Sequence, residues 1–471
     1  MVKTKIVATL GPASNSETVL KRLMLAGVNV FRLNFSHGTP EEHLLEVKLI
    51  RKLSAQLGKN AAVMQDLRGP KIRLGVLNKD PVMLKTGAVV KLFAGQKSDA
   101  PDMLPVTYPR LAQEVKKGDH ILLGDGEIEL RVLGIDAGKL LCKVAVGGET
   151  SSRKGVNLPS GRLSVSAITE KDRNDLQFGV KAGVDFIALS FVRKAEQIEQ
   201  LRKLVRAAGG DIPIIAKIES YQAIKNLDEI ILAADGVMVA RGDLGVEVSL
   251  EEVPPLQKLI IRKANLHARP VITATQMLKS MVENKRPTRA EVTDVANAIY
   301  DGTDAVMLSE ETTIGKYPVD AVKTMVRVAR EAEKHWSGPR AMELSGDKHL
   351  LTIPQAVSHA AAQMCEEMKA KAIVTPTRSG LTARLISRFK PRAPILAIST
   401  RPETVKRLSL VWGVYAHHLP NLEKKPDLLQ TAALCARQLL RLKPGDRIVI
   451  TAGLPIQTPA TTNVVQIKEI R

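Results

Sequence analysis

The sequence has few aromatic residues and few cysteines, and each shortage excludes a class of protein. Aromatic side chains make up 3% of the 471 residues, which leaves few platforms on which single-stranded nucleic acid could stack. The 3 cysteines, Cys142, Cys365 and Cys435, are scattered along the chain. That pattern argues against a disulfide framework or a zinc cluster and indicates a reducing compartment.

Long apolar runs and targeting signals are also missing. No apolar run approaches the roughly 18 residues that a membrane-spanning helix requires. The first residues, MVKTKIVATLGP, have a basic start but lack the apolar core and the small-residue cleavage site of a signal peptide. We therefore expect a cytoplasmic protein with no membrane partner.

Positive charge is what the chain has in excess. Lys and Arg number 69 against 49 Asp and Glu, which gives a net charge of +20. One interpretation is nucleic-acid binding, and another is a basic surface on an enzyme with anionic substrates and effectors. Because extended basic runs are missing and aromatic residues are scarce, we favour the enzyme and expect no nucleic-acid partner.

Strand-like and helix-like segments alternate over the first two thirds of the chain. The strand-like segments are 5–10, 29–35, 62–67, 185–191, 213–219, 236–243, 270–276 and 305–311. Between them lie segments with apolar residues at three- and four-residue spacing, several of which end at a glycine such as Gly27, Gly58 or Gly209. This alternation predicts an α/β fold, a closed parallel (β/α)₈ TIM barrel.

One interruption and one further domain complete the predicted organisation. Residues 72–163 change to short alternating segments, with a hairpin signal in HILLGDGEIEL. We interpret them as an inserted all-β lid, which leaves 1–71 and 164–336 for the barrel. After a polar linker, residues 350–471 alternate again and predict a separate C-terminal α/β domain.

Polar residues stand at the ends of the predicted barrel strands, where active sites of such barrels lie. In strand order they are Arg32, Asn34 and Ser36; Asp66; Arg193 and Lys194; Lys217 and Glu219; Arg241 and Asp243; Thr275 and Gln276; Ser309 and Glu311. Residues two apart on a strand share a face. One such charge is more often a solvated rim residue, but a dense cluster of both signs needs a ligand to organise it.

The residue types in this cluster indicate the chemistry. Glu219 and Asp243 are hard oxygen ligands with no Cys or His beside them in the pattern, which favours Mg²⁺ or Mn²⁺. The run GDLG leads towards a helix whose free N–H groups could hold a carboxylate. Several basic residues indicate bound phosphate: Arg32, Arg73, Lys194 and Lys217. Together these features predict phosphoryl transfer involving a small carboxylic acid, without a P-loop or a Gly-x-Gly-x-x-Gly motif.

Several long motifs, in order along the chain, carry a family resemblance. They are RLNFSHG (32–38), SFVRK (190–194), KIE (217–219), ARGDLG (240–245), ITATQML (272–278) and PTRAEVTDVANAIYDGTDAVMLS (287–309). Together they resemble the pyruvate kinase family. The resemblance implies transfer of a phosphoryl group from phosphoenolpyruvate to ADP, giving pyruvate and ATP in glycolysis. It also implies a homotetramer with a mobile lid and an allosteric C-terminal domain.

The resemblance further implies roles for the residues that bind metal and phosphate. Glu219 and Asp243 would be the ligands of Mg²⁺ or Mn²⁺. Arg32 would bind the phosphoryl group, and Lys217 would neutralise charge on that group and on the enolate oxygen. Contacts to the nucleotide would come from Thr9, Pro12, Asn34, His37, Arg73 and Lys194. Outside its motif, His37 would be an ordinary loop histidine.

A second group of implied roles concerns the carboxylate and the proton. The backbone of Gly242 and Asp243, with the hydroxyl of Thr275, would hold the substrate carboxylate. Thr275 and Ser309 would deliver a proton through water to the enolate carbon. Glu311 would orient these hydroxyl groups.

The chain departs from the family pattern at two places. Many relatives require K⁺ and have Glu at the position of Lys71, so we predict that the Lys71 ammonium replaces K⁺ and that added K⁺ is not required. The alternative is an ordinary surface lysine. The second departure is Gly124, where relatives often have Asp, which leaves any carboxylate role in the lid to Asp125. The predicted pocket for the Lys71 ammonium is formed by Asn34, Ser36, Asp66 and Leu67.

The C-terminal domain contains a candidate effector site. The run TPTRSGLTARL places hydroxyls and backbone N–H groups at the start of a predicted helix, where they could hold a phosphate. A serine N-cap is the plainer interpretation. Because the family binds phosphorylated effectors in this domain, we expect an effector phosphate at Thr377, Ser379, Gly380 and Thr382.

Two other functions are compatible with parts of the pattern. A Mg²⁺-dependent pyruvate or oxaloacetate aldolase or lyase would also hold a 2-oxo acid on a metal, but it would not need Arg73, Lys194 or a lid. A catalytically silent nucleic-acid-binding protein would explain the +20 charge. Formation of ATP from phosphoenolpyruvate and ADP distinguishes all three.

Overall fold

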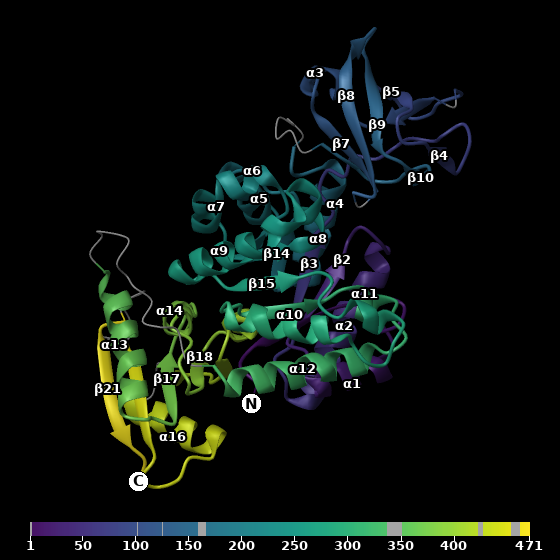
Figure 1. Ribbon diagram of the computed structural model, residues 1–471. Coiled ribbons are helices and arrows are strands. Elements are labelled where there is room, and N and C mark those ends of the chain that lie inside the picture. Colours follow the sequence, from purple (N-terminus) through teal and green to yellow (C-terminus); the bar gives the residue numbers. More distant parts are fainter. Residues whose placement is uncertain are drawn as a thin grey trace.

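Three parts of the chain form three separate bodies (Figure 1). The computed structural model describes residues 2–100, 102–124, 126–158, 166–336, 351–422, 427–453 and 462–471. The barrel lies in the middle, with the lid at one end and the C-terminal domain at the other. The predicted fold class is confirmed. The domain boundaries stay predictions, and those at 163/164 and 350 fall outside the described residues, as does Asp125.

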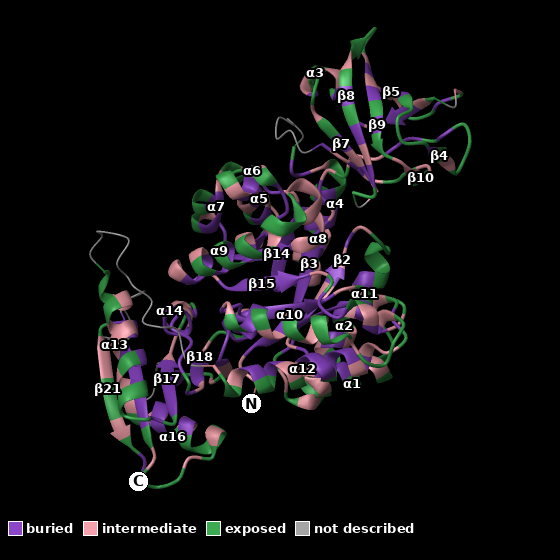
Figure 2. Cartoon of the chain, viewed as in Figure 1, coloured by how far each residue is buried: buried purple, intermediate pink, exposed green. Residues whose placement is uncertain are grey.

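Eight parallel strands close the barrel in the order β1-β16-β15-β14-β13-β12-β3-β2. They are β1 (Lys5–Thr9), β2 (Val30–Asn34), β3 (Ala62–Leu67), β12 (Phe186–Leu189), β13 (Ile214–Ile218), β14 (Gly236–Ala240), β15 (Val271–Ala274) and β16 (Ala305–Leu308). Apart from Arg32 and Asn34 of β2, their residues are buried, because helices cover the outside and side chains fill the inside (Figure 2). Each predicted barrel strand is present, although β12, β14, β15 and β16 end two or three residues earlier than expected.

Helices surround the barrel, and side-chain caps fix where several of them begin. Thr39, Thr169 and Thr288 each cap a helix through a capping box with the acidic residue three positions later. The α-helices of this part are α1 (Glu17–Ala26), α2 (Pro40–Leu57), α4 (Glu170–Ala182), α5 (Ala195–Ala207), α6 (Tyr221–Lys225), α7 (Leu227–Ala233), α8 (Arg241–Glu247), α9 (Val253–Leu266), α10 (Arg289–Tyr300), α11 (Glu310–Thr313) and α12 (Pro318–Lys334). Short 3₁₀ turns occupy η1 (Leu250–Glu252) and η2 (Lys279–Val282).

The lid is a small β domain with its own apolar core. A six-stranded sheet has the order β11-β7-β8-β9-β5-β6, and β10 pairs with β4 beside it. The predicted hairpin is formed by β7 and β8, which pair antiparallel. The elements are β4 (Val82–Leu84), β5 (Val89–Ala94), β6 (Met103–Val106), α3 (Leu111–Glu114), β7 (His120–Leu123), β8 (Ile128–Asp136), β9 (Lys139–Val146), β10 (Gly148–Thr150) and β11 (Val156–Asn157).

The C-terminal domain has a five-stranded sheet in the order β19-β18-β17-β20-β21, parallel except for β21. Its elements are α13 (Ile353–Glu367), β17 (Ala372–Pro376), α14 (Leu381–Ser387), β18 (Ile395–Ser399), α15 (Pro402–Arg407), η3 (Leu408–Leu410), β19 (Val414–His418), α16 (Leu428–Leu440), β20 (Arg447–Ala452) and β21 (Val464–Glu469). The N-terminal segment packs against this domain, since Gly413 N–H donates to Lys3 O at 2.9 Å. In the described part of the chain, no helix has the length and apolar character of a membrane span.

Candidate functional site

The carboxyl ends of the barrel strands bring the predicted charged residues together. Lys217 on β13 lies 2.8 Å from Glu219 Oε1 and 3.4 Å from Asp66 Oδ1 through its Nζ atom. Asp66 also accepts from Arg32 Nε at 2.6 Å. Strands β2 and β3 are neighbours, whereas β13 is separated from β3 by β12. Residues far apart in the sequence therefore form one charged cluster at the barrel mouth.

A residue that the sequence interpretation missed completes this cluster. Ser190, directly after β12, accepts from Lys217 Nζ at 2.7 Å and donates to Leu67 O at 2.8 Å. Its position just past the end of an apolar strand was the available signal, but the contact depends on β12 lying between β3 and β13. Ser190 thus helps to fix the direction of the ammonium group.

Burial and neighbouring charges shift the pKa values of Lys217 and Asp66 in opposite directions. Burial alone would lower the pKa of Lys217, but Asp66 and Glu219 outweigh it and raise that pKa above its usual value. Burial would raise the pKa of Asp66, but Lys217 and Arg32 hold it below the usual range. Lys217 is therefore a fixed positive charge at the carboxyl ends of the barrel strands.

Glu219 and Asp243 form the part of the site that fits a metal ion. Burial, with a further contribution from Asp243, raises the pKa of Glu219 to about 7 against the opposing effect of Lys217. Two carboxylates close enough to repel each other in a buried site are a suitable donor set for a hard divalent cation. Among the described residues no group of three or more metal-ligating side chains is found, so water and substrate oxygens would have to complete the shell.

Arg241 is placed differently from the prediction. The strand was expected to run to Asp243 and to orient Arg241 and Asp243 to one face, but β14 ends at Ala240 and Arg241 begins helix α8. Arg241 instead pairs with Asp294 at 2.7 Å and donates to Thr275 O at 2.8 Å. It therefore fastens the loop after β15, while Asp243 contributes charge near Glu219.

The loop after β15 has a constrained backbone at the predicted carboxylate site. Thr275 and Gln276 adopt φ values of 71° and 55°, a region that non-glycine residues rarely occupy. This conformation places Thr275 Oγ1 2.8 Å from the Gly242 N–H, which donates to it. The hydroxyl and amide assigned to the substrate carboxylate are thus neighbours.

Glu311 and Ser309 lie at the end of the next strand. The buried Glu311 carboxylate accepts from the Ser309 N–H at 2.8 Å and from the Leu278 N–H at 3.0 Å. Each carboxylate oxygen thereby binds a different loop, one after β16 and one after β15. The arrangement is compatible with the orienting role predicted for Glu311, which itself stays a prediction.

The residues predicted to contact the nucleotide lie at the rim of the barrel and at the base of the lid. His37, Pro12 and Lys194 are exposed, and Arg73 donates to Arg153 O at 2.8 Å where the chain enters the lid. Asn34 accepts from the Ser36 N–H at 3.2 Å. Thr9 is 1% exposed and accepts from Arg32 Nη1 at 3.0 Å. From that position Thr9 orients Arg32, and its contact with a nucleotide stays a prediction.

Lys71 lies at the same junction between barrel and lid. Its side chain is exposed and lines a cleft of about 50 Å³ together with Arg193 and Glu247. Burial raises the pKa of Glu247 to about 7, although Arg193 opposes the shift. Within the predicted pocket, Asp66 and Leu67 are buried, and Asn34 and Ser36 are partly exposed.

The predicted effector residues surround the start of α14. Thr377 Oγ1 accepts from the Gly380 N–H at 3.0 Å, and Ser379 Oγ accepts from the Leu381 N–H at 3.4 Å. Gly380 has φ 79°, which favours glycine at this turn. Thr382 is buried and its hydroxyl lies 2.5 Å from that of Thr462. Most of the neighbouring loop, 454–461, is outside the described residues.

Comparison with known proteins identifies the family. The family model described as "Pyruvate kinase, barrel domain" matches residues 1–322, and "Pyruvate kinase, alpha/beta domain" matches 355–468. This chain belongs to the pyruvate kinase family. A pyruvate kinase of Geobacillus stearothermophilus is 45% identical over 99% of this chain and 80% of its own length. Pyruvate kinase 2 of a Synechocystis strain is 46% identical over 100% of this chain and 79% of its own length.

Solved structures agree with the sequence relatives. The crystal structure of a pyruvate kinase from Cryptosporidium parvum superimposes with a TM-score of 0.93 at 36% identity, covering 99% of this chain and 96% of that one. The interrupted barrel and the C-terminal domain are therefore those of the pyruvate kinase fold. The chain is a phosphotransferase of this family.

Proposed function

We propose that the chain transfers the phosphoryl group of phosphoenolpyruvate to ADP, giving pyruvate and ATP. The observation that carries the proposal is the fixed ammonium of Lys217, held by Asp66, Glu219 and Ser190 at the barrel mouth. Both substrates are polyanions, so their approach requires preorganised positive charge. Lys217 and Arg32 supply it from the protein.

The same residues would act at defined points of the transfer. The bond between phosphorus and the enol oxygen breaks as an oxygen of the ADP β-phosphate bonds to phosphorus, and Lys217 faces both the transferred group and the forming enolate oxygen. The Thr275 hydroxyl and the Gly242 N–H, which bond to each other in this structure, would exchange that bond for bonds to the carboxylate. A proton would then reach the enolate carbon through water from the side of Thr275 and Ser309, whose loops Glu311 orients.

A divalent metal belongs to the same proposal. Glu219 and Asp243 would hold Mg²⁺ or Mn²⁺, and the ion when bound supplies charge neutralisation between the two polyanions. We also infer the homotetramer and the cytoplasmic location that the family resemblance implies.

A coupled assay for ATP formation from phosphoenolpyruvate and ADP tests the function. The wild type should form ATP, and Lys217→Met should lose roughly 10²–10³-fold in kcat because the charge opposite the transferred group is gone. Lys181→Met, an exposed lysine on α4, is the matched control and should keep wild-type turnover. Pyruvate formation from phosphoenolpyruvate that does not depend on ADP would contradict kinase activity and indicate hydrolysis of the phosphate ester, with release of inorganic phosphate.

We further propose that Lys71 replaces K⁺. A fixed ammonium has the charge of the monovalent ion, and the Lys71 side chain lines a cleft at the junction of barrel and lid. Turnover in tetramethylammonium buffer should then match turnover with KCl, and Lys71→Glu should become K⁺-dependent. A large loss in tetramethylammonium that KCl restores in the wild type would reject the idea.

The effector site is the remaining part of the proposal. Hydroxyl and N–H groups lie close together between the end of β17 and the start of α14. Such an arrangement is suited to binding a phosphate. Ser379→Asp should abolish activation by a phosphorylated metabolite through charge repulsion while basal turnover stays unchanged. The assay is an activation curve with sugar phosphates, and activation equal to that of the wild type would argue against this site.

A further inference from the structure

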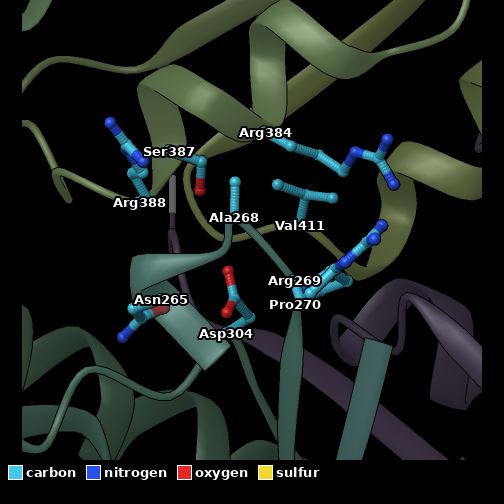
Figure 3. Close-up of a pocket in the computed structure, with 9 residues that line it drawn as sticks. All are labelled: Asn265, Ala268, Arg269, Pro270, Asp304, Arg384, Ser387, Arg388 and Val411. Carbon is cyan, nitrogen blue, oxygen red and sulfur yellow. The ribbon is translucent and has the colours of Figure 1, made fainter. Parts of the chain in front are cut away.

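Arginine side chains from two domains meet beneath the barrel, at the end opposite the catalytic cluster. Arg269 precedes β15 on the barrel, Arg384 belongs to α14 of the C-terminal domain, and Arg388 follows the end of that helix. They line a half-enclosed cavity of about 10 Å³ between the two domains. Figure 3 shows the guanidinium groups of Arg269 and Arg384 turned towards the same space.

These guanidinium groups carry polar atoms that are buried without a partner. Within the described residues, Nε of Arg269, Nε of Arg384, and Nε and Nη2 of Arg388 have no acceptor, whereas Nη2 of Arg269 donates to Leu232 O at 2.9 Å and Nη1 of Arg388 donates to Leu266 O at 3.1 Å. Arg388 is only 4% exposed. A buried donor left unpaired costs about 1–3 kcal/mol, and more on a charged group, so an acceptor is expected at this place.

The nearby acidic residues are already engaged by other groups. Asp304, which lines the cavity, lies 2.9 Å from Lys390 Nζ and accepts from the Trp412 N–H at 3.0 Å. Asp235, the carboxylate beside Arg269, pairs with Arg202 at 2.9 Å. The protein's own carboxylates therefore do not neutralise the pair of guanidinium groups.

The charged groups around Arg384 leave an excess of positive charge. Burial lowers the pKa of Arg384, and Arg269 and Arg407 lower it further, against the opposing effect of Asp235. Arg407 lies 3.5 Å from Asp211, a carboxylate that is 90% exposed. Like charges brought together across an interface destabilise it unless a charge of opposite sign lies between them.

We propose that this cavity is an anion site in which one small inorganic anion binds between Arg269 of the barrel and Arg384 of α14. The cavity has room for about one water-sized particle, so it would take a halide ion or a single oxygen of a phosphate or sulfate. The anion would accept from both guanidinium groups and couple the C-terminal domain to the barrel. Because α14 begins at the residues assigned to the effector, anion binding would also fix the helix that carries that site.

Unfolding of the full chain at constant ionic strength tests the site. Sodium gluconate is the reference salt, and it is exchanged stepwise for sodium bromide, sulfate or phosphate. Bound anion stabilises only the folded state, so at ten times its Kd the unfolding equilibrium constant should fall about elevenfold. The gain should vanish in Arg384→Gln and Arg269→Gln. Arg437→Gln, an exposed arginine on α16, should keep it.

The stability gains measured with each anion and each variant distinguish the possible kinds of site. A gain with bromide assigns a halide site, and a gain with phosphate or sulfate alone assigns an oxyanion. Crystals grown in bromide should show an anomalous peak between Arg269 and Arg384. The proposal is overturned if Arg384→Gln keeps the wild-type anion dependence, or if it changes stability equally in every salt. A bromide peak without variant-sensitive stabilisation would mean an adventitious ion only, and would also overturn it.

Discussion

Lys217 Nζ contacts three different side chains, each from a different strand end of the barrel. Asp66 and Glu219 fix its charge, and Ser190 fixes its direction. An ammonium on a flexible stem would otherwise sample many positions. Under the proposed function, the charge held in this way would need little reorganisation when a phosphoryl group approaches. Electrostatic stabilisation of a transition state depends on that property.

At the residue scale, Ser190→Ala should lower kcat by roughly 10- to 150-fold. Loss of one hydrogen bond to a charged group corresponds to about 1.5–3 kcal/mol, and Lys217 would then tilt towards Asp66 and Glu219. Steady-state kinetics should show the effect in kcat more than in KM, and Ser190→Thr, which keeps the hydroxyl, should recover part of it. Ser358→Ala, a buried serine on α13, is the control. Turnover within twofold of the wild type would contradict the positioning role.

The residues of the site differ in how far the sequence could predict them. Lys217 and Glu219 stand two apart at the end of an apolar segment, so strand periodicity alone places them on one face, and the structure places them 2.8 Å apart. Ser190 gave a weaker signal because a serine after a strand is common. Its contact with Lys217 follows from strand order in the closed barrel, which no local pattern contains.

At the scale of elements, the loops after β14 and β15 act together. Arg241, at the first position of α8, bonds to the carbonyls of Ala274 and Thr275 and to the Asp294 carboxylate of α10. This contact holds Thr275 in its positive-φ conformation. The guanidinium group has enough donors to reach all of these acceptors at once, which an ammonium cannot do with the same geometry.

Arg241→Lys should therefore raise the KM for phosphoenolpyruvate by about tenfold, an effect of roughly 1.4 kcal/mol. The substrate carboxylate would meet a loop that is no longer fixed, whereas the overall fold should be retained. The measurement is the KM for each substrate together with the unfolding midpoint. An equal rise in the KM for ADP, or a large fall in the midpoint, would indicate general disruption instead of a local change in the loop.

Element boundaries explain why Arg241 was assigned to the wrong face. The apolar run continues to Ala240 with no breaker before Arg241, so the sequence favours a longer strand. In the structure the chain turns directly into α8. The Gly242 N–H is then satisfied by Thr275 from the neighbouring strand, a tertiary contact that outweighs the local preference. The central parts of all eight strands were predictable, and their ends were not.

At the scale of the whole molecule, buried lysines join the barrel to the C-terminal domain. Lys5 on β1 donates to Val414 O at 2.6 Å and lies 4.7 Å from the centre of the Tyr415 ring. Lys390 pairs with Asp304 at 2.9 Å from the other side. Burial lowers the pKa of Lys5 from 10.5 to about 8, although Glu333 and Asp304 oppose the shift.

This shift predicts how stability depends on pH. The folded pKa is below the unfolded one, so between about pH 8 and 10.5 the unfolded chain binds more protons and stability rises with pH. Below pH 8 the cost of a buried ammonium is present in full. The free energy of unfolding of the wild type relative to Lys5→Met should rise by about 2–3 kcal/mol from pH 7 to pH 10. Urea unfolding at both pH values measures it, and a flat difference would show that Lys5 has an ordinary pKa.

The lid is joined to the barrel by a short two-stranded stem. Leu74 N–H donates to Lys154 O at 2.8 Å, and Val156 N–H donates to Ile72 O at 3.0 Å, so the incoming and outgoing strands run side by side. The lid also has its own apolar core. The lid could therefore be replaced by the lid of a relative, with both junctions placed in the stem and the barrel sequence left unchanged. Such chimaeras would separate the contributions of lid and barrel to turnover.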